Sequence, residues 1–249
     1  MVSWLLEKWR KSRIFNYGYV VRDEWMKEEA KKVPKGAKVL DVGCGTAPYR
    51  TLFSHCDYKT HDFKQLNSSQ NRAGKSYYKK IDYVSDITKI PVEDNYFDVV
   101  ICTEVLEHVP EPILALKEFS RIVKPGGIVL LSAPLAGFVH QEPYHYYGGF
   151  SPFFYKKFLT DFGFEKVQVL KNEGFFKFYG MMGVRFVQDL SPKKVTKNIL
   201  LQILWFPFWL VLLFILPFKL IFMHLIDRLD KSNYSTAGYH IKAKKINKK

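Results

Sequence analysis

The chain has 249 residues, a length that suits one α/β domain plus an additional segment. Its formal net charge of +14 is uneven, because residues 36–170 carry 15 basic and 15 acidic side chains and the excess lies in residues 1–35 and 171–249. A neutral centre argues against a nucleic-acid-binding surface there, whereas basic runs beside apolar ones in the flanks fit an anionic membrane surface.

The cysteines show no paired spacing. Two of the three, Cys44, Cys56 and Cys102, fall in stretches that read as buried strands. We therefore expect reduced thiols, a cytoplasmic compartment and no zinc site.

The first 15 residues are rich in tryptophan, leucine and cations. Met1 to Phe15 has neither the long apolar core nor the small-residue cleavage site of a secretory signal. Two interpretations stay open: a helix lying in the membrane interface, with Trp4 and Trp9 at headgroup level, or an amphipathic helix packed on the domain. A second, charged helix is predicted from Arg22 to Lys32, ended by Pro34.

The stretch from Lys38 to Pro48 reads as a buried strand and its turn. An apolar run ends in Asp41, and Gly43 and Gly45 follow one residue apart. Both glycines can take positive φ and leave room for a ligand to approach the backbone, so a cofactor is expected across this turn. The alternative is an ordinary strand-to-helix turn, since the third glycine of the dinucleotide fingerprint is absent.

Further strands follow at regular distances. The second ends at Asp62, 21 positions after Asp41, where a ribose-binding carboxylate belongs in such folds. A third ends near Asp86, and a fourth, from Tyr96, runs into a helix. This alternation predicts a parallel sheet with helices on both faces. We place strands near 37–42, 57–62, 81–86, 97–103, 127–133 and 164–170, and the clearest helices at 112–123 and 152–162.

With the Lys-Pro-Gly-Gly run at 124–127, this series resembles the class I S-adenosylmethionine-dependent methyltransferases, particularly those that methylate small molecules, quinones and lipid-linked glycans. The resemblance covers residues 36–170. It implies an α/β, Rossmann-like, mostly parallel sheet of seven strands whose seventh strand is antiparallel, with helices on both faces.

The region after residue 171 departs from that plan. An edge strand is expected only at Ala237 to Lys244, where apolar and polar residues alternate. We therefore divide the chain into N-terminal helices at 1–35, for which the interfacial interpretation stays open, a methyltransferase domain at 36–173 and 236–246, and a hydrophobic helical insertion between strands 6 and 7 at 174–235.

Within the insertion, Ile199 to Ile226 is long and apolar. One crossing of a bilayer would strand the last strand on the far side, and 28 residues are too few for two crossings of about 20 each. Pro207 and Pro217 can bend a helix, so we expect the segment to turn back as a monotopic hairpin or an interfacial helix pair on the cytoplasmic face. The alternative is a helical pair buried against the domain or a dimer partner.

The resemblance also implies which residues hold the cofactor. The methionine half would contact Asp41, Gly43, Cys44 and Gly45, the ribose would bind Asp62, and the adenine would meet Asp86 and Ile87. The methyl channel would be lined by Thr103 and Glu104, at the carboxyl end of the fourth strand.

A divalent metal is a further possibility. Glu104, Glu107 and His108 are spaced i, i+3, i+4 and could share one helical face, with His140 or His145 completing the shell. Similar clusters bind a metal in some methyltransferases that the chain resembles. The alternative is that His108 is a local cap or packing residue.

The loop from His140 to Tyr147 is rich in aromatic residues and histidines, and it lies where the family places substrate contacts. Aromatic faces can stack on a sugar or quinone ring, and either His140 or His145 can act as a base, with Glu104 nearby. The alternative is a lid with only packing duties.

The favoured function is O-methylation of a small-molecule, lipid or lipid-linked glycan acceptor, at a membrane whose lipids are the main partner. An RNA methyltransferase is disfavoured by the neutral catalytic region and by the lack of Asn-Pro-Pro-Tyr or Pro-Cys signatures. A non-catalytic membrane-associated protein that keeps the fold is the other alternative. The sequence names neither the acceptor nor the oligomeric state.

Overall fold

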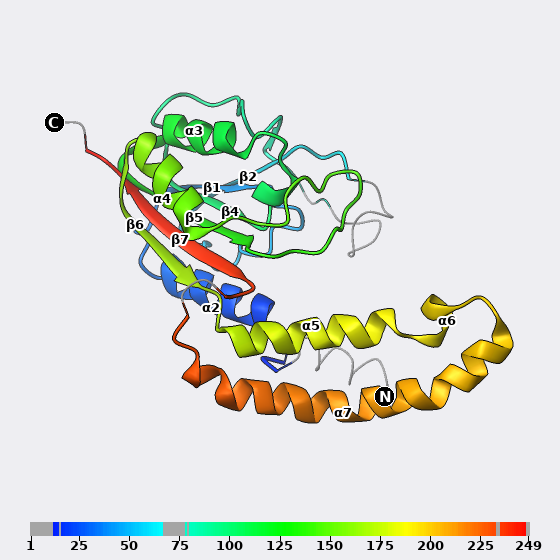
Figure 1. Cartoon of the computed structure of the whole chain (residues 1–249). Coiled ribbons are helices and arrows are strands. Elements are labelled where there is room, and N and C mark those ends of the chain that lie inside the picture. Colours follow the sequence, from blue (N-terminus) through cyan, green and yellow to red (C-terminus); the bar gives the residue numbers. More distant parts are fainter. Residues whose placement is uncertain (1–11, 15, 67–77, 79, 233–234, 248–249) are drawn as a thin grey trace. The chain divides into compact units, whose positions relative to one another are not determined.

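The computed structural model describes residues 12–14, 16–66, 78, 80–232 and 235–247. Most of the helix expected at Met1 to Phe15 therefore lies outside the described residues. The chain divides into two compact units (Figure 1). The sheet unit comprises Glu24–Lys171 and Gly238–Lys249, and the hairpin unit comprises Met1–Asp23 and Asn172–Ala237.

The sheet unit contains a seven-stranded sheet in the order β3-β2-β1-β4-β5-β7-β6. All neighbouring strands pair in parallel except β7, which is antiparallel to both β5 and β6. This confirms the predicted fold class, including the antiparallel seventh strand. The strands are β1 Lys38–Val42, β2 Asp57–Asp62, β3 Tyr83–Val84, β4 Phe97–Thr103, β5 Val123–Pro134, β6 Phe164–Lys171 and β7 Gly238–Lys245.

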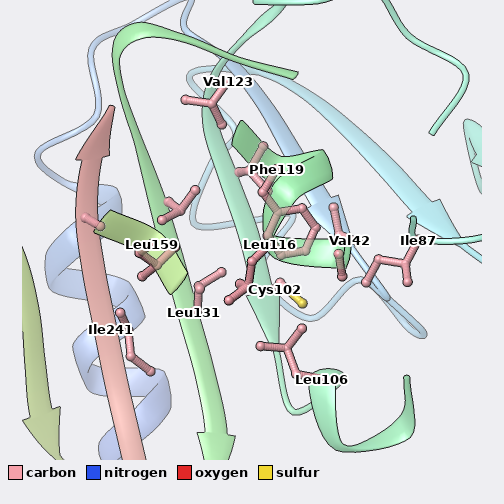
Figure 2. Packing of buried hydrophobic residues seen from close by; sticks show 14 of the residues in the cluster. Val42, Ile87, Cys102, Leu106, Leu116, Phe119, Val123, Leu131, Leu159 and Ile241 are labelled. Carbon is pink, nitrogen blue, oxygen red and sulfur yellow. The ribbon is translucent and has the colours of Figure 1, made fainter. Parts of the chain in front are cut away.

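The central strands are buried on both faces, so their sequences are apolar runs rather than alternating ones. In β1, Leu40 packs into one core cluster and its neighbour Val39 into another on the opposite face, as the two-residue period of a strand requires. Figure 2 shows the first cluster, in which Cys102 and Leu131 lie close to Leu116 of α3, Pro112–Ile122. The second cluster is covered by α2, Tyr17–Ala30, through Met26 and Ala30, among others.

Among the described residues, helices α2, α3 and α4 pack on this sheet, and the starts of α3 and α4 follow the sequence signals. Helix α4, Pro152–Asp161, begins after Ser151, whose hydroxyl accepts a hydrogen bond from the Phe154 amide at 3.4 Å, and has proline in its first turn. Helix α3, Pro112–Ile122, also begins at a proline. Helix α2, Tyr17–Ala30, begins five residues before the predicted Arg22 start.

The helix predicted after the fourth strand is absent from the described part of the sheet unit, and no helix follows the first strand either. Residues 43–56, between β1 and β2, form turns and no regular helix. After β4 there is only a three-residue 3₁₀ helix, η2, Leu106–His108. The left-handed φ of 54° at Glu104 keeps β4 from running directly into a helix, and the extended backbone of Val109, before Pro110, ends η2.

The hairpin unit is built on two antiparallel helices, α5 Phe175–Asp189 and α7 Ile199–Ile226, joined through the short α6, Pro192–Val195, with η3, Asp227–Leu229, after α7. Near the connection, the indole Nε1 of Trp209 donates to the Val187 carbonyl at 3.0 Å. At the other end of the pair, where α5 begins and α7 ends, the Asp227 carboxylate accepts hydrogen bonds from the amides of Gly174 and Lys177 at 3.0 and 2.9 Å. The two helices are therefore tied together at both ends.

Between these ends, glycines let the helices approach closely. A Cβ atom on Gly180 would lie 3.2 Å from a methyl carbon of Leu220, and one on Gly183 would lie 2.8 Å from the Lys219 ammonium. Small residues at such contacts maximise packing between helices. The Lys219 ammonium itself lies 4.3 Å from the centre of the Tyr179 ring.

The expectation that Ile199 to Ile226 turns back on itself is wrong. The segment is one helix of 28 residues with Pro207 and Pro217 inside it. Each proline removes one backbone hydrogen bond, but packing along α5 holds the helix together across both positions. A helix pair does form, and its members are α5 and α7.

Candidate active site

A cavity of about 320 Å³ opens at the carboxyl ends of the parallel strands. Gly43 follows β1, Asp62 ends β2, Asp86 follows β3 and Glu104 follows β4, and all four line the cavity. Ligands of open α/β sheets bind at this edge. The wall is completed by His61, Phe63, Gln65, Leu66, Ile87, Thr88, Val105, His108, Val109, Pro110, Glu111, Gln141, Tyr144 and Tyr146.

The turn after β1 requires glycine at its first position for two reasons. Gly43 has a φ of 66°, and a Cβ atom there would lie 2.4 Å from a methyl carbon of Val105. Gly45 also has a left-handed φ, 51°, and its amide donates to Asp62 Oδ2 at 3.0 Å. The turn thus presents bare backbone to the cavity and fixes the neighbouring carboxylate.

Asp62 is held in place by backbone amides. Its second oxygen, Oδ1, accepts from the Lys64 amide at 3.0 Å. Burial raises the pKa of Asp62, and the amides that donate to it counteract that rise by favouring the carboxylate. A buried acceptor fixed in this way can bind a pair of ligand hydroxyls without first having to order itself.

Asp41 has a different environment. Its side chain is 2% exposed and accepts a hydrogen bond from the Tyr58 hydroxyl of β2. Burial, with a smaller contribution from the Asp62 charge, raises the pKa of Asp41 to about 7. Asp41 does not line the cavity, and its hydrogen bond with Tyr58 joins β1 to β2.

The predicted cofactor residues accordingly fall into two groups. Those that line the cavity are Gly43, Asp62, Asp86 and Ile87, and those that do not line it are Asp41, Cys44, Gly45 and Thr103. Asp86 uses Oδ1 to accept from the Thr88 amide and hydroxyl at 2.8 and 2.6 Å, and these bonds lower its pKa.

The single helical face expected for Glu104, Glu107 and His108 does not form. Glu104 lies outside η2 with its left-handed φ, and its Oε1 accepts from the Ser132 hydroxyl of β5 at 2.8 Å. Glu107 is 1% exposed, and its Oε1 lies 3.7 Å from Nε2 of His108. Of the two glutamates, Glu107 is the one placed beside the histidine.

His108 instead lies beside both histidines of the loop from His140 to Tyr147. Its ring centre lies 4.6 Å from that of His140 and 5.5 Å from that of His145, and the two loop rings lie 4.8 Å apart. The loop is anchored here because the amides of Tyr146 and Tyr147 donate to the Glu107 carbonyl at 2.9 and 3.2 Å. We call His108, His140 and His145 the histidine cluster.

Hydrogen bonds fix the proton positions in two of these rings. Nδ1 of His108 bonds the Tyr144 carbonyl, and Nδ1 of His140 bonds the Phe138 carbonyl at 2.8 Å. Because a carbonyl only accepts, each Nδ1 carries hydrogen and each Nε2 of the neutral ring keeps a free lone pair. Burial lowers the pKa of His108 to about 4, so this ring is neutral at physiological pH. The cluster can therefore accept a proton or hold a cation.

Residues 40–131 match the family described as "Methyltransferase domain". This match runs from β1 into β5, and in fold and sequence the sheet unit is similar to class I methyltransferase domains. Over 153 residues the chain is 35% identical to a demethylmenaquinone methyltransferase of Bacillus pumilus, an alignment that covers 57% of this chain and 64% of that protein. The chain thus spans less than two thirds of the length of this relative.

Solved structures show the same fold at low sequence identity. One is an S-adenosylmethionine-dependent methyltransferase from Archaeoglobus fulgidus, with a TM-score of 0.52, 18% identity, and coverage of 90% of this chain and 94% of that one. Another is the [4+2]-cyclase SpnF, with a TM-score of 0.53, 18% identity, and coverage of 92% and 82%. Because a protein called a cyclase shares this fold, the reaction has to be argued from the site.

Sequence reasoning missed several residues of this candidate site. His61 lines the cavity, and its Nε2 bonds the Ser85 carbonyl at 3.1 Å, yet it reads as an ordinary strand residue before Asp62. Tyr144 packs edge-on against Phe63 at 5.3 Å between ring centres, a contact between loops far apart in sequence. The aromatic character of the His140 to Tyr147 loop was its only sequence signal.

Proposed function

We propose that the protein transfers a methyl group from S-adenosylmethionine to an oxygen of a quinone-type, lipid or lipid-linked acceptor at a membrane. The observation that supports the proposal is the position of His108, which lines the same cavity as Gly43 and the fixed Asp62 carboxylate and lies beside His140 and His145. Cofactor, acceptor and proton acceptor then share one space.

The residues present fit the cofactor. Gly43 has no side chain to obstruct a ligand, Asp62 offers two buried carboxylate oxygens suited to ribose hydroxyls, and Asp86 with Ile87 offers a polar and an apolar contact suited to adenine. When bound, S-adenosylmethionine supplies an electrophilic methyl group on a sulfonium. The protein then has to position the acceptor and remove its hydroxyl proton.

Proton removal is the task of the histidine cluster. A neutral imidazole Nε2 of the cluster would take the hydroxyl proton of the acceptor, whose oxygen would receive the methyl group that the cofactor supplies. His108 lines the cavity and has its Nδ1 proton held by the Tyr144 carbonyl, so it joins His140 and His145 as a candidate base. Tyr144 and Tyr146, on the same wall, offer ring faces to an aromatic acceptor.

A divalent ion in the cluster is a second candidate, favoured by one observation. Ligand atoms of His108, His140 and His145 all lie within 4.8 Å of one another, and Nδ1 of His145 is buried with no hydrogen-bond partner in the described part of the chain. Imidazole nitrogens with Glu107 nearby would suit a transition metal, which would lower the pKa of a bound acceptor hydroxyl.

The proposal is tested in two steps on the full chain. Calorimetry should first show binding of S-adenosylmethionine, and radiolabelled methyl groups should then appear in extracted membrane lipids and in neither RNA nor protein. Mass spectrometry of the product would locate the methylated atom. Binding without transfer to any lipid fraction would favour a non-catalytic role, and transfer to RNA would favour the rival enzyme.

A further inference from the structure

Helix α7 buries only a narrow stripe of its surface. The half-buried and buried positions recur every three or four residues and include Gln202, Trp205, Trp209, Leu212, Leu216 and Leu220. This is the spacing of one helix face, and it lies against α5. The mean hydropathy of the best 18-residue window of the helix is 2.5, and none of that window is buried.

The opposite face of α7 is apolar along its whole length. Leu204 is 75% exposed and Phe214 is 71% exposed, and no acidic residue occurs in the helix. We define this outer face by Ile203, Leu204, Val211, Phe214, Phe218 and Leu225, which lie roughly half a turn from the buried stripe. An apolar strip of this size marks an interaction with a lipid surface or a protein.

Charges at the two ends of the outer face distinguish between these occupants. Lys193 and Lys197 precede α7, and Arg228 and Lys231 follow it. All four are exposed, and none has an acidic partner among the described residues, whereas Arg185 and Lys194 are both paired with Asp189. A second copy of the chain, packed antiparallel on the outer face, would bring these cations together, while anionic headgroups would neutralise them.

The orientation follows from lengths and charges. At 1.5 Å per residue, α7 would be about 42 Å long and α5 only about 22 Å, against a hydrocarbon thickness of about 30 Å. If the hairpin crossed the bilayer, α5 would be too short, and its Arg185 and Asp189 ion pair would enter the hydrocarbon. Both ends of the hairpin also return to one sheet, because β6 pairs with β7.

We propose that the α5–α7 hairpin lies flat in the headgroup region of an anionic bilayer, with its outer face among the acyl chains and its free cations on lipid phosphates. A hollow of about 400 Å³ at the connection between the helices supports this, because it is lined by Lys193 together with apolar side chains, among them Ile199, Ile203 and Phe206. Such a lining suits one acyl chain with an anionic headgroup at its end.

This inference deepens the membrane part of the proposed function and is tested without turnover. Full-length protein is mixed with vesicles of phosphatidylcholine alone or with phosphatidylglycerol and floated on a density gradient. Binding to the anionic vesicles should be about tenfold or more tighter and should weaken in high salt. The double variant Lys193→Ala/Lys197→Ala should lose that preference.

The apolar part is tested by Phe214→Glu, which should weaken binding to both kinds of vesicle. Phe153→Glu is the matched control, since Phe153 is 63% exposed in the sheet unit. Cofactor affinity should stay unchanged in all these variants, so that failure to bind vesicles is distinct from failure of methyl transfer. A protein that floats with neither vesicle and forms a defined dimer without detergent would overturn the inference in favour of a second copy.

Depth measurements test the orientation. Leu204→Cys, Phe214→Cys and Leu225→Cys are made in a Cys56→Ser background, because Cys56 is the partly exposed native thiol. Each is labelled with a fluorophore, and quenching by nitroxides at the headgroup and deep in the chains is compared. A flat hairpin places all three labels at one shallow depth. A deep label at 214 between shallow labels at 204 and 225 would show a crossing helix and contradict the flat arrangement.

Discussion

Val105 occupies the space that a side chain on Gly43 would need, with its nearest methyl carbon 2.4 Å from the ideal Cβ position. Two features therefore constrain the turn that should hold the cofactor. One is the left-handed φ of Gly43, and the other is the packing of Val105, in the segment after β4. Gly43→Ala should displace Val105 and weaken cofactor affinity about tenfold or more.

Gly36→Ala is the control for that variant. Gly36 has a similar left-handed φ of 78°, but nothing lies within 4 Å of its added Cβ. It should cost only the ~1–2 kcal/mol of an alanine in this conformation and leave cofactor affinity unchanged. Calorimetric titration of both variants makes the comparison, and equal affinities would remove the Gly43 turn from the binding site.

Asp62→Ala should weaken S-adenosylmethionine binding by ~1–3 kcal/mol, because two hydrogen bonds to a buried carboxylate would be lost. Asp57→Ala, at the exposed start of the same strand, should bind the cofactor as the wild type does. If both variants bind normally by calorimetry, the ribose does not sit at Asp62.

His108→Gln should reduce kcat by about 10²–10⁴ if the ring is the general base. His55→Gln, at a histidine that bonds the Val33 carbonyl far from the cavity wall, is the matched control and should keep full activity. A chelator separates the two roles of the histidine cluster. Activity that persists in excess chelator identifies a simple base, whereas loss of activity and recovery with a divalent ion identify a metal site.

The buried Asp41 should make stability depend on pH. Its pKa is raised from 3.8 to about 7, so the native state favours the neutral acid. The stabilisation this gives is complete below about pH 4 and is lost as pH rises through 7. Asp41→Asn stays neutral, so relative to the wild type its midpoint of thermal unfolding should rise between pH 5 and pH 8. An unchanged difference across that range would show that Asp41 is ionised in the folded protein.

The sheet was predictable because its signals are local. The apolar run before Gly43 and the proline starts of α3 and α4 each depend on neighbouring residues, and their positions agree with the structure within a few residues. The strand after residue 237 could be found by its alternation for the same reason.

The predictions that were wrong depend on contacts between residues far apart in the sequence. The backbone at Glu104 turns left-handed where its side chain meets Ser132 of β5, so the spacing of Glu104, Glu107 and His108 gave no information about their arrangement. The meeting of His108 with two histidines of a later loop joins segments more than 30 residues apart. The sequence of residues 199–226 does not show whether Pro207 and Pro217 break the helix, because that depends on packing against α5.

The carboxylate of Asp227 closes the hairpin unit by bonding the Gly174 and Lys177 amides, which brings the first and last residues of a roughly 50-residue excursion within hydrogen-bond distance. Because the two ends of this segment lie together, the segment can be removed without separating the strands that it connects. A short peptide bridge in place of residues 175–226 should leave the β6–β7 pairing intact and give a water-soluble sheet unit for crystallisation. The same geometry lets such a sheet gain or lose a helical arm through one insertion or deletion.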